Sequence, residues 1–192
     1  MASRINARSR RQRSRGSEPG TSSAKSAGYL EALAQLGEIC GTRAYPLGAT
    51  PCAFSFHVHS SKGTLDLEKI QARFVPLGCF VFAINPKASR VAIIPAVDKY
   101  EAIKAMGTNG ANHNLLPADI IRWLRRLEAK QPFVLIGIGF DFLSGKFTSR
   151  IANARTLARK MLAFCPDLDS VEDVGELAAE LAKHRPFFFW WD

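Results

Sequence analysis

The sequence predicts a single α+β domain in which helices pack on a mixed or antiparallel β-sheet. Its 192 residues are 47% hydrophobic, which is enough to build one core without disulfides or metals. Continuous apolar runs at 78–84, 91–94 and 132–140 have the composition of inner strands. Segments with apolar residues at helical spacing separate these runs, so we expect helices and strands to share one body.

The first half of this body is predicted to alternate helices with strands. Apolar residues recur every three to four positions from 29 to 39, which predicts a short helix. Residues 53–59 alternate apolar with polar side chains and therefore have the period of a half-buried strand. We expect a second helix at 65–74, followed by two inner strands that the turn formers Asn85-Pro86 separate.

The second half adds helices and a final strand. We expect helices at 98–106, 117–130 and 151–162, a polar loop at 107–114, and a hairpin formed by 132–140 and 142–148. Ser170 and Asp173 resemble a capping box for a last helix, and the chain closes in an apolar strand over 187–192. This order of elements is that of a split βαβ or ferredoxin-like core with C-terminal helices and a final strand.

Most of the net charge of +9 lies in residues 1–28, which we expect to form a disordered basic tail before the domain at 29–192. The tail carries seven arginine and lysine residues against Glu18, a net charge of +6 that leaves +3 for the rest. It has almost no large apolar side chain with which to offset the entropy of ordering. Such a tail can bind nucleic acid weakly and non-specifically through phosphate contacts.

Targeting and cofactor signals are lacking in the sequence. No apolar signal core follows the basic run, and no segment is long and uncharged enough to span a bilayer. We therefore expect a cytoplasmic protein with no membrane partner, although an arginine- and serine-rich leader also fits an organellar transit peptide. Four scattered cysteines without a Cys-x-x-Cys pair indicate neither a zinc cage nor a disulfide framework. We expect no cofactor and no metal.

Four short motifs in the second half form a distinctive series. They are Thr108-Asn109-Gly110-Ala111-Asn112, Asp119-Ile120-Ile121-x-Trp123-Leu124, Phe164-Cys165-Pro166-Asp167 and Trp190-Trp191-Asp192. Over roughly residues 75–192, this series resembles that of the domain-of-unknown-function family numbered 4253, which ends in Trp-Trp-Asp. The resemblance implies shared fold and kinship, and it brings no established activity. Two departures from the family pattern are His113, in place of an aromatic residue, and 168–171, in place of an Asp-Gln-Gly stretch.

The candidate ligand-binding residues come from these motifs and from the end of a predicted strand. They are Thr108, Asn109, Gly110, Asn112, His113, Asp141, Asp167, Trp190, Trp191 and Asp192. Polar side chains on a loop held by a rigid frame are typical of ligand sites. Asn and Gly also form left-handed turns, so a structural role of the loop stays open. As strand residues, Trp190 and Trp191 would point to opposite faces, one into the core and the other toward a helix or groove.

Other residues fit functional sites less well. His57 and His59 lie on one side of a predicted strand, but no third metal ligand is predictable beside them. Cys165 follows a helix, whose negative end raises a thiol pKa, and this argues against a nucleophile. Asp98, Asp141 and Asp167 all lie at the ends of predicted helices or strands. They therefore form either a carboxylate cluster for catalysis or metal binding, or ordinary helix caps and turns.

Three functions are compatible with these patterns, and the catalytic residues of any enzyme stay unassigned. The first is a non-catalytic domain that binds an unknown protein partner, because no nucleophile-base pair and no metal-ligand spacing is evident. An exposed apolar groove beside the loop would support it. The second is a hydrolase-like enzyme in which loop amides, His113 and aspartates meet in one cleft. The third is non-specific, steeply salt-dependent nucleic-acid binding through the tail.

Overall fold

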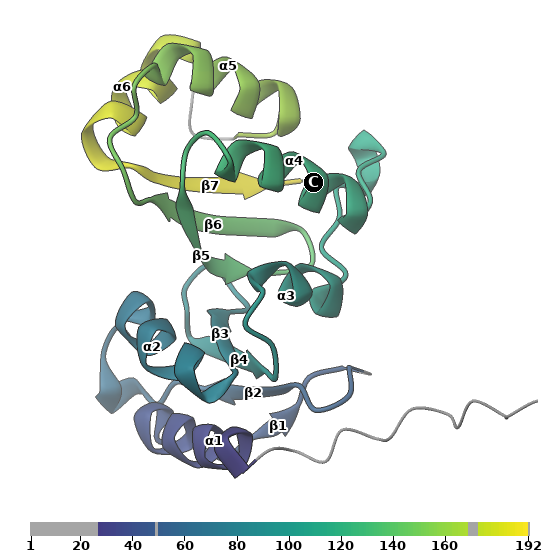
Figure 1. Ribbon diagram of the computed structural model, residues 1–192, viewed down its shortest axis with the longest axis vertical. Coiled ribbons are helices and arrows are strands. Elements are labelled where there is room, and N and C mark those ends of the chain that lie inside the picture. Colours follow the sequence, from purple (N-terminus) through teal and green to yellow (C-terminus); the bar gives the residue numbers. More distant parts are fainter. Residues whose placement is uncertain (1–26, 49, 169–172, 192) are drawn as a thin grey trace, which may run out of the picture.

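The computed structural model describes residues 27–48, 50–168 and 173–191. Its helices are α1 (Ala27–Cys40), α2 (Leu67–Phe74), α3 (Lys99–Met106), α4 (Pro117–Glu128), α5 (Ala154–Phe164) and α6 (Val174–His184). Its strands are β1 (Tyr45–Pro46), β2 (Phe54–His57), β3 (Phe80–Ala83), β4 (Arg90–Ile94), β5 (Phe133–Ile138), β6 (Phe142–Phe147) and β7 (Pro186–Trp190) (Figure 1). Residues 1–26 of the expected tail lie outside the described residues, whereas Ala27 and Gly28 open α1. None of the helices in the described ranges is long and apolar enough to cross a membrane.

The strands form one seven-stranded mixed sheet in the order β1-β2-β4-β3-β5-β6-β7. Neighbouring strands are antiparallel except β3 and β5, which run parallel and pair through Ala83 and Gly137. β4 lies between β2 and β3, so β2, α2 and β3 form a split βαβ unit. The predicted fold class, α+β in a single domain, is confirmed.

The ferredoxin-like arrangement is not confirmed, because β5 occupies a different place. In a ferredoxin-like sheet the fourth core strand lies beside the first, which here would place β5 next to β2. The outer edge of β2 is instead taken by β1, through the pairs Tyr45 with Ser55 and Pro46 with Phe54. β5 therefore extends the sheet on the other side, beside β3, and β6 and β7 continue it.

Different helices cover the two faces of the sheet. Val81 and Ala83 of β3 face a core shared with α1 and α2. Phe80 and Phe82 of the same strand face a core shared with α3, α4, α5 and α6. This alternation follows from the two-residue period of a strand. Because both faces of the inner strands are covered, their sequences are apolar without interruption.

A glutamine of α2 joins the two strands of the parallel pair. The Gln71 side chain is buried, and its Nε2 donates hydrogen bonds to the carbonyl oxygens of Val81 (2.8 Å) and Leu135 (2.7 Å). Buried carbonyl groups need such partners, because leaving them without one costs about as much as a lost hydrogen bond. Gln71 thus adds a side-chain link between β3 and β5, whose backbones pair at one position, Ala83 with Gly137.

On one face, the sheet extends beyond its helices. Among the described residues, the core that α1 and α2 share includes no residue of β6 or β7. On this face Phe142 stacks on Phe188, with ring centroids 5.8 Å apart, and Trp190 is 41% exposed. Phe140 is also exposed, in the turn between β5 and β6. We call Phe140, Phe142, Phe188 and Trp190 the aromatic surface.

The last helix begins later than the sequence pattern predicts. Asp173 is the N-cap of α6, and its Oδ1 accepts hydrogen bonds from the backbone N–H groups of Gly175 (2.5 Å) and Glu176 (2.9 Å). Asp173 therefore has the role that the capping-box pattern gave to Ser170, which lies outside the described residues.

Candidate functional site

The polar loop is fixed to the turn between β5 and β6. Thr108 is fully buried, and its hydroxyl donates a hydrogen bond to the carbonyl oxygen of Gly139 (2.6 Å). The backbone N–H of Asn109 donates to the carbonyl oxygen of Phe140 (2.9 Å). The side-chain amide of Asn109 donates to the carbonyl oxygen of Gly107 (2.9 Å). Both polar side chains therefore donate hydrogen bonds within the chain itself.

The loop closes on itself between Gly110 and Leu115. Their backbones exchange two hydrogen bonds, of 2.9 and 3.0 Å, around the short 3-10 turn Ala111–His113. Asn114 ends this turn in the left-handed region, at a φ of 55°, which Asn tolerates better than most residues. Asn112 lies on the exposed side of the turn. Gly110 and Asn114 of the loop therefore serve to form this turn.

The indole of Trp191 covers the loop from the core side. The Trp191 side chain is buried, and a Cβ atom at Gly110 would lie 2.8 Å from two carbons of its ring. The backbone N–H of Trp191 donates to the carbonyl oxygen of Asp141 (2.9 Å), and the indole packs edge-on against Phe164. The C-terminal end of the described chain is therefore an integral part of the domain, beside α4 (Figure 1).

The Cys-Pro-Asp segment contacts both the loop and the C-terminal strand. Cys165 is buried at the end of α5, and its Sγ–H donates to the carbonyl oxygen of Trp190 (3.0 Å). Asp167 Oδ2 lies 2.5 Å from His113 Nε2, and the side chains of the pair are 31% and 27% exposed. A histidine beside a carboxylate is held in one orientation and can exchange a proton with a substrate.

These contacts gather most of the predicted site residues at one corner of the sheet. Asp192 lies outside the described residues. His57 and His59 lie elsewhere, at the end of β2, where His59 Nδ1 accepts a hydrogen bond from the backbone N–H of Ser61 (3.3 Å). Within the described parts of the chain, no group of three His, Cys, Asp or Glu side chains is placed to hold a metal ion.

An apolar groove lies beside this corner. It encloses about 470 Å³, and its apolar lining includes Leu47, Ile84, Met106, Phe140, Phe142 and Trp190. Arg90 and Asp141 add one charge of each sign to the lining. Trp190 faces this groove while Trp191 enters the core, because successive strand residues point to opposite faces.

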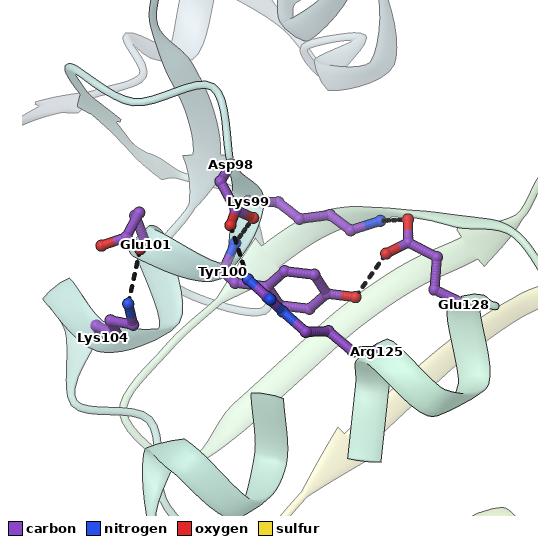
Figure 2. A network of polar contacts seen from close by, with 7 residues as sticks. All are labelled: Asp98, Lys99, Tyr100, Glu101, Lys104, Arg125 and Glu128. Atoms are coloured by element: carbon purple, nitrogen blue, oxygen red, sulfur yellow. Dashed lines mark hydrogen bonds and ion pairs between the residues drawn. The ribbon is translucent and has the colours of Figure 1, made fainter. Parts of the chain in front are cut away.

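A second polar cluster ties α3 to α4 and β5, and Figure 2 shows its side chains meeting above the sheet. Lys99 Nζ donates hydrogen bonds to Glu128 Oε1 (2.5 Å) and to the carbonyl oxygen of Phe133 (2.8 Å). The hydroxyl of Tyr100 donates to Glu128 Oε2 (2.7 Å). Burial, followed by this hydrogen bond, holds the pKa of Tyr100 well above its usual range. Tyr100 therefore stays a protonated donor.

Asp98 belongs to this cluster as a helix cap. Its Oδ1 accepts a hydrogen bond from the backbone N–H of Tyr100 (2.9 Å), and its Oδ2 pairs with Arg125 (3.0 Å) (Figure 2). The Arg125 guanidinium lies over the Tyr100 ring, 4.9 Å from its centroid. Because these charges are paired with one another, we assign the cluster a structural role.

Sequence reasoning missed several residues that shape the groove and the cluster. Phe140 ends the apolar run that predicted a strand over 132–140, yet β5 stops at Ile138 and the Phe140 side chain is 64% exposed. The Gly139 that interrupts the run was the available signal for this turn. Lys99 and Glu128 lie far apart in the sequence, and no local pattern indicates that they pair.

The corner and the groove define the class of protein. It is an α+β domain in which a polar loop, a Cys-Pro-Asp segment and a double-tryptophan strand end build one corner of the sheet. The chain belongs to the family described as Domain of unknown function (DUF4253), which matches residues 90–192. The match contains all four motifs and the elements from β4 to β7. No curated protein and no solved structure matches the chain.

Proposed function

We propose that this chain is a non-catalytic protein-binding domain whose groove receives an apolar side chain of its partner. The observation that carries this proposal is the exposure of the aromatic surface, where Phe140, Phe188 and Trp190 are 64%, 38% and 41% exposed. Aromatic side chains are enriched at protein interfaces, and Trp and Tyr are frequent among the residues that dominate binding energy.

The rigid setting of Trp190 supports a binding role. Its strand pairs with β6 along its whole length, with Trp190 opposite Phe142, and its carbonyl oxygen accepts the Cys165 thiol. Phe142 in turn stacks on Phe188. Binding to a surface that is already ordered avoids much of the entropic cost of association.

The lining of the groove supports a polypeptide as the partner. A volume of about 470 Å³ is large enough for one or two side chains, and its lining is apolar except at a few positions. Arg90 and Asp141 add a donor and an acceptor to its lining, which suits the mixed polarity of a peptide segment.

Site-specific photo-cross-linking tests this proposal. Benzoylphenylalanine in place of Phe188 is expected to cross-link one protein of different sequence in the cells from which the gene comes. The same replacement at Leu30, which is 51% exposed on α1, serves as the control. Adding Trp190→Ser to the Phe188 cross-linker is expected to remove the adduct while leaving the thermal unfolding transition in place. Identical adducts from both positions, or adducts of the chain with itself alone, would overturn the proposal.

A second candidate function is hydrolase-like catalysis, and the His113–Asp167 pair favours it. The 2.5 Å contact fixes the imidazole through Nε2, so Nδ1 would act as the base. The loop offers this base little help, because the donor groups of Thr108 and Asn109 already bond to backbone carbonyls. Protein binding is therefore the better supported function.

Model substrates separate the two candidates. If His113 is a general base, hydrolysis of p-nitrophenyl acetate or phosphate should fall by about 100-fold or more in His113→Asn. His184→Asn, an exposed histidine of α6, provides the matched control. Rates that are equal in these two variants would exclude the enzyme and leave the binding proposal intact.

A further inference from the structure

A separate groove lies between α4 and the start of α5. It encloses about 350 Å³, and it shares no lining residue with the groove beside Trp190. Its size is within the range of sites that take small organic molecules.

The floor of this groove is apolar and firmly held. Leu127 and Leu157 are 9% and 7% exposed, and Ile151 lies beside them. The Trp123 ring stacks on Phe164 in a parallel orientation, with centroids 3.9 Å apart and an interplanar angle of 5°. The floor therefore offers an aromatic and aliphatic contact surface without needing to rearrange.

The rim of the groove carries positive charge only. Arg126, Lys130 and Lys160 are exposed lining residues, and no carboxylate lines the groove. Among the described residues, none of these three cations has an ion-pair partner.

Cations of the same helix that lie outside the groove are neutralised. Arg122 pairs with Asp119 at 2.8 Å, and Arg125 pairs with Asp98 at 3.0 Å. The positive charge of α4 is therefore left uncompensated where the helix borders the groove. Such a concentration of one sign of charge beside a low-dielectric wall attracts anions.

We infer that this groove binds a small amphipathic anion. The apolar body of the ligand lies on Trp123, Leu127 and Leu157, and its carboxylate or phosphate lies among the three rim cations. Burial of the apolar body provides the affinity, and charge-assisted hydrogen bonds to the cations fix the orientation.

Titration of the full-length protein with octanoate and octyl phosphate tests the inference. The readout is the NMR resonance of the Trp123 indole N–H, assigned with Trp123→Phe. Both probes are expected to shift it saturably, and the tighter one identifies the preferred head group. Octanol, which lacks the charge, and acetate and inorganic phosphate, which lack the apolar body, are expected to bind at least about tenfold more weakly.

Variants that remove the three rim cations test whether their charge contributes to binding. The triple variant Arg126→Gln, Lys130→Gln, Lys160→Gln is expected to weaken binding of the better probe by at least about tenfold. Arg73→Gln, Lys87→Gln, Lys183→Gln removes the same charge from exposed positions elsewhere and is expected to leave affinity within about twofold. Equal losses in the two triples, octanol binding as tightly as octanoate, or no saturable shift up to about 10 mM would overturn the inference.

Discussion

The indole of Trp191 covers Gly110 so closely that a Cβ atom at Gly110 would meet two ring carbons at 2.8 Å. This contact joins two of the family's motifs, one from the loop before α4 and one from the end of β7. The backbone carbonyl oxygen of Asp141 accepts a hydrogen bond from the Trp191 backbone N–H, and the Cys165 thiol donates one to the carbonyl oxygen of the neighbouring Trp190. The motifs are thus held together mainly by packing and by hydrogen bonds to backbone carbonyl oxygens.

Gly110→Ala is expected to lower the free energy of unfolding by about 1–3 kcal/mol, because the added methyl group overpacks the Trp191 ring. Gly28→Ala in α1 is the control, since its Cβ would meet the Leu77 backbone at ordinary distances, 3.5 Å from the carbonyl oxygen and 4.0 Å from Cα. Urea denaturation of both variants measures the difference. Two equally stable variants would show that the contact with Trp191 does not constrain Gly110.

The two adjacent tryptophans should differ sharply in their contribution to stability. Trp191→Ala removes a buried ring from the core and should cost about 3–5 kcal/mol. Trp190→Ala removes a ring that is 41% exposed and should cost under about 1 kcal/mol. Chemical denaturation gives both values. A larger loss from Trp190→Ala than from Trp191→Ala would contradict the strand register of β7.

Gln71→Leu should destabilise the domain by about 1–3 kcal/mol, because the carbonyl oxygens of Val81 and Leu135 lose their shared donor. Gln35→Leu on α1 is the matched control, since among the described residues Gln35 donates to the exposed side chain of Glu31 and to no backbone carbonyl. The control should stay within about 0.5 kcal/mol of wild type. Indistinguishable denaturation midpoints for the two variants would show that the hydrogen bonds from Gln71 to these two carbonyl oxygens do not stabilise the domain.

Two buried thiols should make the fold sensitive to alkaline pH. Burial raises the pKa of Cys40 and of Cys79 from an ordinary 9.0 to about 11, with Lys62 opposing the shift at Cys40. Between these values the unfolded chain has lost protons that the folded chain keeps, so stability falls as pH rises from 9 toward 11. Denaturation midpoints across this window should fall less steeply in Cys40→Ala, Cys79→Ala. An unchanged slope would locate the alkaline sensitivity elsewhere.

Local sequence patterns predicted most of the helices and strands, because a helix or a strand depends mainly on residues that are close together in the sequence. The apolar runs gave β3, β4 and β5, and helical spacing gave the helices that cover them. The N-cap position of Asp173 has a local cause, since Ser and Asp are both good N-caps and the sequence pattern alone does not decide between them.

Long-range pairing could not be predicted from these patterns. β5 lies beside β3, and β1 takes the outer edge of β2, yet the two-residue β1 has no strand signal of its own. The sequence motifs named most of the residues that gather at the corner of the sheet. They did not show which of these side chains would form hydrogen bonds with the chain itself and so be unable to contact a ligand. Thr108 was a candidate ligand contact, and its hydroxyl is instead buried against Gly139.

Binding through the aromatic surface is tested most directly by one dissociation constant. The protein cross-linked at Phe188 should be purified and titrated against the wild-type chain and Trp190→Ser. The substitution is expected to raise the dissociation constant by at least about 30-fold, as the loss of a dominant interface residue does. An unchanged dissociation constant, with Trp190→Ser folded, would contradict a binding role for this surface.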